Sequence, residues 1–523
     1  MQRTRHLAAA IVLALAATPL RAAMAQAQQP DDATFYLIVG SDTLFAEHRV
    51  RTPSHVEGEL LVRAANRRVR FDAALSPDAL MRELRVYAAA SPGDSMQLRQ
   101  TLRFSGDSVR STVANDSATV AAPHGALPYI NPSPTFMEQM ALRLRALHAD
   151  SANIPLFAPE STPVTVSVRR LPHDSVLVSL SGVELRLALA QDGTLLGGTV
   201  PAQRLRIVRA PAGSPLSSAP KDYSAPAAAP YTAQDVTITT PAGVTLAGTL
   251  TMPKAHTGRV PAVVTITGSG QQDRDEAIPG IDGYRPFRQI ADTLGRRGIA
   301  VLRLDDRGIG GSGGDPTTET SADYANDVQG AVAWLRARPD IDPARIALLG
   351  HSEGGYVAPM VASTDSTIAA IVLLAGPSRT GRRVIAYQLE RQIERANADS
   401  ATRDSLRRAL PARMDSMGTN PWMRYFYAHD PAATARTVHV PVLILQGGHD
   451  VQVTPDQAPE LAAAFRAGGN THVTMHVFPT LNHLFLEDPQ GETEYAALPS
   501  KTVPPVVLGM IADWLVATLH VGG

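Results

Sequence analysis

The sequence predicts an α/β fold, with a mostly parallel sheet covered by helices on both faces, preceded by an antiparallel β-rich domain. Strand and helix patterns alternate after residue 231, whereas residues 34–208 contain short strands separated by turn residues. Between them, residues 210–230 are rich in proline and alanine, a composition that favours an extended linker over a core. At 523 residues the chain exceeds a single hydrophobic core, and two or three units are expected.

Residues 1–27 are typical of a cleaved signal peptide. Arg3 and Arg5 precede the apolar stretch Leu7–Ala17, and small residues at Ala25 and Ala27 offer cleavage sites. This stretch is too short to cross a bilayer about 30 Å thick, and no later segment is long enough either. We therefore expect an exported protein, periplasmic or secreted, with no membrane span. The chain contains no cysteine, which excludes disulfides and thiolate chemistry and fits an oxidising compartment.

The net charge of -1 argues against binding to nucleic acid or anionic lipid, because both favour a strongly basic surface. A small, neutral or weakly charged substrate is expected instead. The sequence leaves the oligomeric state open.

Residues 28–209 are predicted to form the β-rich domain. One helical stretch, Thr135–His148, places Phe136, Met140, Leu144 and Leu147 on one face, which favours a core role. No repeat of propeller-blade length is present in this region. The predicted strands are Phe35–Val39, Glu59–Val62, Val69–Ala73, Arg82–Ala88, Val164–Val168, Ser175–Leu180 and Val183–Leu189.

Residues 231–523 carry the α/β pattern, in which ligands gather at the carboxyl ends of the strands. The predicted strands are Asp235–Thr240, Val244–Thr251, Pro261–Thr267, Ala300–Leu304, Arg345–Leu349, Ala369–Leu374, Val442–Gln446 and Val473–Phe478. The predicted helices are Arg285–Arg296, Ala322–Ala337, Gly354–Ala362, Pro459–Ala467 and Val506–Leu519.

The run Ile346–Tyr356 delivers an apolar strand into G-x-S-x-G. Gly350 and Gly354 permit a tight strand-to-helix turn that lifts the hydroxyl of Ser352 clear of the sheet, where a hydrolase places its nucleophile. A helix-opening turn without chemistry is the alternative interpretation.

A serine hydroxyl needs a histidine to take its proton and a carboxylate to orient that histidine. Asp450 follows the strand Val442–Gln446, and His483 lies in a loop after the last strand, which gives the chain order Ser, Asp, His. Asp456 is the alternative carboxylate. His439, His472 and His476 lie in or before strands and are poorer candidates for the base.

An oxyanion hole requires two N–H groups directed at the developing charge. Glu353, which follows the nucleophile, is expected to supply one. The glycine-containing loop Thr265–Glu276 should supply the other, from Ser269 or Gln271. The loop lacks the lysine and the spacing of a phosphate-binding loop.

Three motifs carry a resemblance to a known family: G-H-S-E-G-G around Ser352, L-R-L-D-D-R-G-I-G-G-S-G at Leu302–Gly313, and G-S-G-x-x-D-R-D-E at Gly268–Glu276. Residues 231–519 resemble the α/β-hydrolase superfamily, and more narrowly bacterial serine esterases related to dienelactone hydrolases and prolyl-oligopeptidase peptidases. The resemblance implies an α/β-hydrolase fold with Ser352, Asp450 and His483 as its triad. It also implies that Asp305, Asp306 and Arg307 brace the oxyanion loop.

An insertion at about residues 377–438 interrupts the alternation where such folds carry a helical lid. Val384–Ala396 and Ser400–Met417 are predicted to be amphipathic helices, with Leu389, Ile393, Leu406 and Leu410 inward. The segment that follows is rich in aromatic residues, and Trp422, Tyr425 and Phe426 are candidates for an acyl or aromatic pocket. Packing of the lid against the core is the alternative.

Together these features predict an exported serine hydrolase that cleaves carboxylic esters through an acyl-enzyme, with a small-molecule ester as substrate and no metal or organic cofactor implied. The alternatives are a serine peptidase of the prolyl-oligopeptidase type, in which Glu276 or Glu390 would hold a peptide amine, and an inactive binding protein on a hydrolase scaffold. Acyl chain length does not follow from the sequence.

Overall fold

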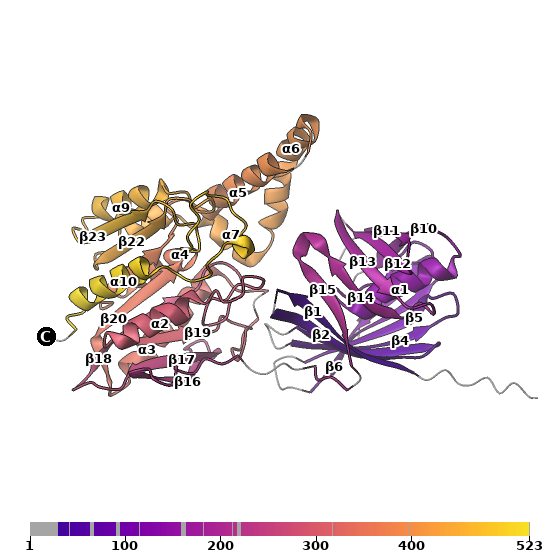
Figure 1. Cartoon of the computed structure of the whole chain (residues 1–523), viewed down its shortest axis with the longest axis horizontal. Coiled ribbons are helices and arrows are strands. Elements are labelled where there is room, and N and C mark those ends of the chain that lie inside the picture. Colours follow the sequence, from indigo (N-terminus) through magenta and orange to yellow (C-terminus); the bar gives the residue numbers. More distant parts are fainter. Residues whose placement is uncertain are drawn as a thin grey trace, which may run out of the picture.

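The computed structural model describes residues 30–521 except 41, 63–66, 90–94, 115, 158–163, 181, 212, 217–220, 316 and 397. The predicted signal peptide lies outside these residues. Two sheets organise the chain, one formed by its first part and one by its second (Figure 1). The predicted fold class, an α/β-hydrolase fold after an antiparallel β-rich domain, is confirmed.

The first sheet has fifteen strands in the order β8-β7-β6-β5-β4-β3-β2-β1-β15-β14-β13-β12-β11-β10-β9. Neighbouring strands are antiparallel, except β9 and β10. Because β1 pairs with both β2 and β15, it joins the two halves of the sheet. The strands are β1 (Asp31–Val39), β2 (Asp42–Arg51), β3 (His55–Val62), β4 (Arg67–Leu75), β5 (Met81–Ala88), β6 (Gln97–Ser105), β7 (Ser108–Val113), β8 (Asp116–Ala121), β9 (Leu127–Pro128), β10 (Ser151–Phe157), β11 (Val164–Leu171), β12 (Ser175–Leu180), β13 (Val183–Leu189), β14 (Leu195–Val200) and β15 (Leu205–Ala210).

Helix α1 (Pro134–Ala146) packs against this sheet through its predicted apolar face. Phe136, Met140 and Leu144 are buried, but Leu147 is 44% exposed, because the helix ends before it. A fully buried ion pair between Arg49 of β2 and Glu138 of α1, 2.9 Å long, also joins the helix to the sheet.

The second sheet has the order β16-β17-β19-β18-β20-β21-β22-β23 and is parallel from β19 onward. Its buried strands are almost continuously apolar, as expected when helices cover both faces. The strands are β16 (Tyr231–Thr239), β17 (Thr245–Pro253), β18 (Val260–Ile266), β19 (Ala300–Leu304), β20 (Ile341–His351), β21 (Ala370–Leu374), β22 (Val442–Gly447) and β23 (Val473–Phe478).

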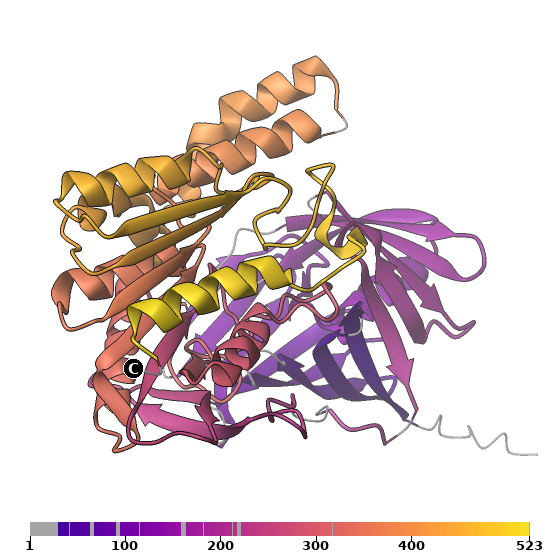
Figure 2. The ribbon, with the colours of Figure 1, turned by 60° about the vertical axis from the view of Figure 1, so that its left-hand side comes forward.

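Helices α2 (Pro286–Arg296) and α10 (Pro505–Thr518) lie together on one face of this sheet (Figure 2). Helices α3 (Ser321–Arg336), α4 (Gly354–Thr364), α8 (Pro431–Ala435) and α9 (Gln457–Ala467) pack into the core of the other face. The loops at the carboxyl ends of β18, β20, β22 and β23 therefore meet at one edge. Within the described residues, no helix is long and apolar enough to cross a membrane.

The predicted lid region contains α5 (Gly381–Arg395), α6 (Ser400–Met417) and α7 (Pro421–Ala428), and α5 and α6 project away from the sheet (Figure 1). Leu389 and Ile393 are buried as predicted. The inward placement of Leu406 is wrong, since its side chain is 41% exposed. Met414 is the one fully buried residue of helix α6, with Leu410, predicted inward, and Met417 packed against the same apolar cluster, and most of the helix surface faces solvent.

The predicted linker falls between β15 and β16, and part of it packs against the rest of the chain. Lys221 Nζ lies 2.6 Å from Asp273 Oδ2, and the guanidinium of Arg274 stacks over the ring of Tyr223 at 4.3 Å. These contacts join the linker to the loop that follows β18.

Candidate active site

The nucleophile candidate, Ser352, lies at the turn between β20 and α4. Its backbone has φ +53°, a left-handed conformation that costs a non-glycine residue energy and is typical of functional turns. A Cβ at Gly350 would collide with the carbonyl oxygen of Gly354, and one at Gly354 would collide with that of Ile266. Both glycines are therefore required by close backbone contacts, as the G-x-S-x-G motif indicated.

The structure brings Ser352, His483 and Asp450 together in one hydrogen-bonded chain. His483 Nε2 lies 3.1 Å from Ser352 Oγ, and His483 Nδ1 lies 2.8 Å from Asp450 Oδ2. Asp450 and His483 are 2% and 3% exposed. Because an ionised carboxylate only accepts hydrogen bonds, Nδ1 carries the proton and Nε2 is directed at the serine.

The carboxylate of Asp450 is held from several sides. Its Oδ1 accepts hydrogen bonds from the N–H groups of Gln452 and Val453, at 2.8 and 2.9 Å, and its Oδ2 accepts one from Gln446 Nε2 at 2.9 Å. These contacts fix the carboxylate toward His483. The role of Gln446, at the end of β22, was not predicted from the sequence.

The alternative candidates lie elsewhere. Asp456 forms an ion pair with Arg379, and the side chains of His439, His472 and His476 are exposed. None of these residues takes part in the hydrogen-bonded chain of side chains at Ser352.

The loop after β18 carries the predicted oxyanion donors. Ser269 and Gln271 are both exposed, so both remain candidates beside Glu353. The predicted bracing role of Asp306 is visible: it accepts hydrogen bonds from Thr267 Oγ1 at 2.7 Å and from the N–H of Gln272 at 2.9 Å. Burial raises the pKa of Asp306 well above its usual range, although both hydrogen bonds oppose this.

Asp305 braces the loop after β18 as predicted, through Arg274, whereas Arg307 pairs with α3 instead. Asp305 pairs with Arg274 at 2.7 Å, and Arg307 pairs with Asp327 of α3 at 2.5 Å. These ion pairs fix the loop that begins at the carboxyl end of β19.

The side chain of Glu353 links the nucleophile turn to the lid. Its Oε1 accepts hydrogen bonds from Ser321 Oγ of α3 at 2.6 Å and from Trp422 Nε1 of α7 at 2.8 Å. Burial raises the pKa of Glu353, against the hydrogen bonds that it accepts. No sequence pattern indicates this link, since the three residues are far apart along the chain.

The three aromatic candidates of the lid have different surroundings. Phe426 is buried and meets Tyr356 edge-on, with ring centroids 5.1 Å apart. Trp422 stacks on Phe426 at 5.4 Å, and Tyr425 stacks on His429 at 6.0 Å. Phe426 thus packs within the lid cluster, whereas Trp422 is half-buried and adjoins Glu353. A pocket role stays a prediction for all three.

Glu276 and His351 form a buried pair that the sequence motifs did not reveal. Glu276 Oε1 lies 2.8 Å from His351 Nδ1 and accepts the N–H of Gly268 at 2.7 Å. Burial alone would lower the pKa of His351, but the charge of Glu276 and hydrogen bonds to Glu276 and the His483 carbonyl raise it.

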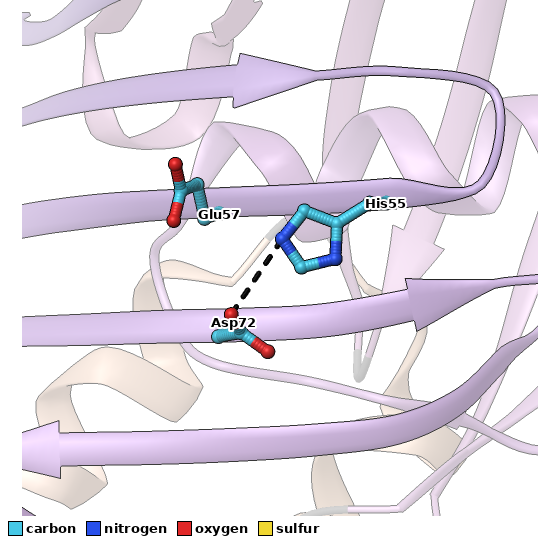
Figure 3. A group of neighbouring side chains, drawn as sticks. All are labelled: His55, Glu57 and Asp72. Carbon is cyan, nitrogen blue, oxygen red and sulfur yellow. Dashed lines mark ion pairs between the residues drawn. The ribbon is translucent and has the colours of Figure 1, made fainter.

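One group of side chains on the N-terminal sheet has ligand atoms close enough to share a metal ion. His55 and Glu57 of β3 and Asp72 of β4 place these atoms within 4.8 Å of one another. Figure 3 shows His55 facing Asp72, with Nε2 and Oδ2 3.5 Å apart. The group takes no part in the chain at Ser352.

The sheet order, the strained serine turn and the hydrogen-bonded chain of side chains give the second sheet and its helices an α/β-hydrolase fold. A family model for serine aminopeptidase S33 matches residues 280–490. The resemblance noted from the sequence is thereby confirmed: this part of the chain is similar to that family and has an α/β-hydrolase fold.

Several characterised proteins are similar to this part. Esterase EstD of Thermotoga maritima is 32% identical over 283 residues, which span 52% of this chain and 65% of that protein. Dipeptidyl aminopeptidase BIII of Pseudoxanthomonas mexicana is 28% identical over 254 residues, 46% of this chain and 34% of the relative. The chain therefore spans less than two thirds of either relative. The esterase Pf2001 structure from Pyrococcus furiosus is 18% identical, with a TM-score of 0.42, and covers 57% of this chain and 95% of the other.

Proposed function

We propose that this protein is an exported serine hydrolase that cleaves carboxylic esters through an acyl-enzyme. The observation that carries the proposal is the chain Asp450–His483–Ser352, with contacts of 2.8 and 3.1 Å. A serine hydroxyl at this distance from a histidine that is held by a carboxylate has the arrangement of an activated nucleophile.

In the proposed reaction, Ser352 Oγ attacks the ester carbonyl carbon while His483 Nε2 accepts the hydroxyl proton. The tetrahedral intermediate then collapses, and His483 donates this proton to the departing alcohol. Water next attacks the acyl-enzyme with His483 as base, which releases the acid and restores Ser352. Asp450 stabilises the imidazolium form of His483 in both halves.

Negative charge develops on the carbonyl oxygen during each attack. The N–H of Glu353 is the proposed first donor to this oxygen, and the N–H of Ser269 or Gln271 is the second. The hydrogen bonds that Asp306 accepts from Thr267 and Gln272 lie on either side of both candidates and support the shape of the loop after β18.

A peptidase of the prolyl-oligopeptidase type is the second candidate, favoured by the serine aminopeptidase family match and the dipeptidyl aminopeptidase relative. Such an enzyme needs an acidic side chain free to hold a substrate amine. Glu276 is buried against His351, and Glu390 pairs with Arg407 at 2.5 Å. With both acids engaged, the ester substrate is favoured. The complete hydrogen-bonded arrangement of Ser352, His483 and Asp450 argues against an inactive scaffold.

Export is proposed from the basic and apolar pattern of residues 1–27. The test is fractionation of expressing cells, followed by sequencing of the amino terminus of the purified protein. A mature protein that begins near residue 26 or 28 in the exported fraction supports export. Full-length protein confined to the cytoplasm contradicts it.

The activity is tested by labelling with a fluorophosphonate, which reacts with activated serines, and by a chain-length series of nitrophenyl esters beside proline and alanine peptide anilides. We expect Ser352-dependent labelling and ester turnover with little anilide turnover. Faster anilide hydrolysis would select the peptidase. A folded protein that is neither labelled nor active would be an inactive scaffold.

A further inference from the structure

The proposed chemistry requires three loops, each of which follows a different strand, to keep fixed positions relative to one another. The oxyanion loop follows β18, the nucleophile turn follows β20, and the loop that carries His483 follows β23. The contact between Ser352 and His483 joins two of them, but its 3.1 Å hydrogen bond must break and re-form during turnover. Contacts that do not take part in the reaction are therefore needed to maintain the geometry.

Glu276 contacts two of these loops through one oxygen. Its side chain is buried, and its Oε1 accepts the N–H of Gly268 at 2.7 Å and lies 2.8 Å from His351 Nδ1. Gly268 immediately precedes Ser269, one of the two candidate oxyanion donors, and His351 immediately precedes Ser352. The loop and the turn are closely packed at this point, because a Cβ at Gly268 would lie 3.2 Å from Ser352 Cβ and 3.3 Å from Glu276 Oε1.

His351 extends the connection to the third loop. Its Nε2 lies 2.9 Å from the backbone carbonyl oxygen of His483. A carbonyl oxygen only accepts hydrogen bonds, so Nε2 carries a proton. With Nδ1 directed at a carboxylate, both ring nitrogens donate, and the imidazolium is neutralised by Glu276. Removal of that charge would leave a buried cation without a partner, which is unfavourable.

We propose that Glu276 and His351 are a positioning pair. The pair holds the oxyanion loop, the nucleophile turn and the His483 backbone in fixed relative positions without touching the substrate. This inference rests on the proposed serine-hydrolase function. The pair lies beside the triad: the His351 and His483 rings have centroids 5.0 Å apart and are tilted by 43°. Small displacements of reacting groups cost large factors in rate, so the pair should act on turnover more than on substrate binding.

The test compares Glu276→Gln with Asp275→Asn in the full-length protein. Asp275 is the neighbouring acid of the same loop and equally buried, but its carboxylate pairs with Arg303 of β19 instead of His351 of the nucleophile turn. For Glu276→Gln we expect kcat to fall on the order of 10- to 100-fold with little change in KM. Asp275→Asn should lower the melting temperature and keep kcat.

A second readout separates positioning from general destabilisation. A trifluoromethyl ketone forms a tetrahedral adduct with the serine and so reports on the oxyanion geometry. In Glu276→Gln, its inhibition constant should weaken by about the same factor as kcat/KM falls. The inference is overturned if the inhibitor binds Glu276→Gln as tightly as it binds wild type, or if Asp275→Asn loses as much kcat.

The pair is tested as a unit by His351→Gln, alone and combined with Glu276→Gln. Because both residues act through one set of contacts, the double variant should lose about as much kcat as the worse single variant, whereas independent roles would multiply the losses. Multiplied losses contradict the pairing. A Ser352→Ala control distinguishes the two hypotheses: if it stays active, the proposed function fails, and if it is inactive while Glu276→Gln is unimpaired, the positioning pair alone fails.

Discussion

The edge of the second sheet and the lid above it are built in different ways. At the edge, Asp450 and Glu353 are buried, Asp306 is half-buried, and each accepts at least two hydrogen bonds. In the lid, α5 and α6 present much of their surface to solvent and are held mainly by one apolar cluster around Tyr356 and Phe426. Geometry at the edge is over-determined, whereas geometry in the lid depends on packing.

This difference separates two kinds of property. Groups that perform chemistry must be held within fractions of an ångström, and the edge supplies the required contacts from rigid strands. Substrate preference depends on shape, which helices with fewer contacts can alter without disturbing the nucleophile. Changes at the edge should therefore alter rate by large factors, and changes in the lid should alter preference or stability by small ones.

The largest effect is expected from Ser352→Ala. Loss of the nucleophile should reduce kcat on the order of 10⁶-fold, the scale of a triad serine. The fold should survive, because the Ser352 N–H still donates to the carbonyl of Leu374. Ester turnover and melting temperature are measured together. Ser363→Ala is the control, since the Ser363 hydroxyl bonds to a carbonyl of its own helix. A Ser352→Ala variant with most of its activity would remove the central proposal.

His483→Ala should be nearly as severe, and Asp450→Asn somewhat less, with a loss of about 10⁴-fold in kcat from the wrong tautomer. The measurement is nitrophenyl ester turnover at saturating substrate. His476→Ala is the matched control, because this exposed residue of β23 lies near in sequence and outside the chain of hydrogen bonds. If His476→Ala or His472→Ala silenced the enzyme and His483→Ala did not, the base would be misassigned.

A smaller effect concerns the pH dependence of stability. The pKa of His351 is raised in the folded state, since the charge of Glu276 and hydrogen bonds to Glu276 and the His483 carbonyl outweigh burial. A histidine whose pKa is raised by folding stabilises the folded protein at pH values below its unfolded pKa of about 6.5. This stabilisation is lost as the pH rises through the pKa of the folded state. Chemical denaturation of wild type and His351→Gln across this range should show a stability difference that shrinks as pH rises. A pH-independent difference would contradict a charged His351.

Elements with a local sequence pattern could be predicted from the sequence, whereas those that depend on long-range packing could not. Strands β12, β13, β19 and β23 were predicted with the bounds that they have, because their apolar patterns are local. Strand β2 was missed because its inward Glu47 and Arg49 break the alternation. Both are buried, Glu47 against Thr135 at 2.6 Å and Arg49 against Glu138 at 2.9 Å, and such pairing is invisible until α1 is placed.

The same distinction between local patterns and long-range contacts applies to the candidate active site. Ser352, Asp450 and His483 could be chosen because each follows a recognisable strand, and parallel strands bring their carboxyl ends to one edge. The Glu276–His351 pair could not, since it joins residues 75 positions apart with no repeating pattern. The link from Trp422 to Glu353 escaped prediction for the same reason.

The smallest effect is expected in the lid, where packing and specificity can be separated. Phe426 is 4% exposed and meets Tyr356. Phe426→Ala should therefore lower the free energy of unfolding by roughly 3 to 5 kcal/mol, the usual cost of emptying an aromatic site in a core. If Phe426 only packs, the relative preference of this variant across the ester series should stay unchanged, and a changed profile would place Phe426 at the predicted pocket. This variant is the packing reference for its neighbour.

Trp422 differs because its Nε1–H donates to Glu353 Oε1 while its ring stacks on Phe426. If the ring borders the acyl pocket, Trp422→Ala should change the ratio of kcat/KM between short and long acyl esters, by at most roughly 1 to 3 kcal/mol per methylene contact. Trp422→Phe, which keeps a ring but loses the N–H, should retain more of the original ratio. Melting temperature is measured on the same variants. A destabilised Trp422→Ala protein with an unchanged chain-length profile would assign Trp422 to packing.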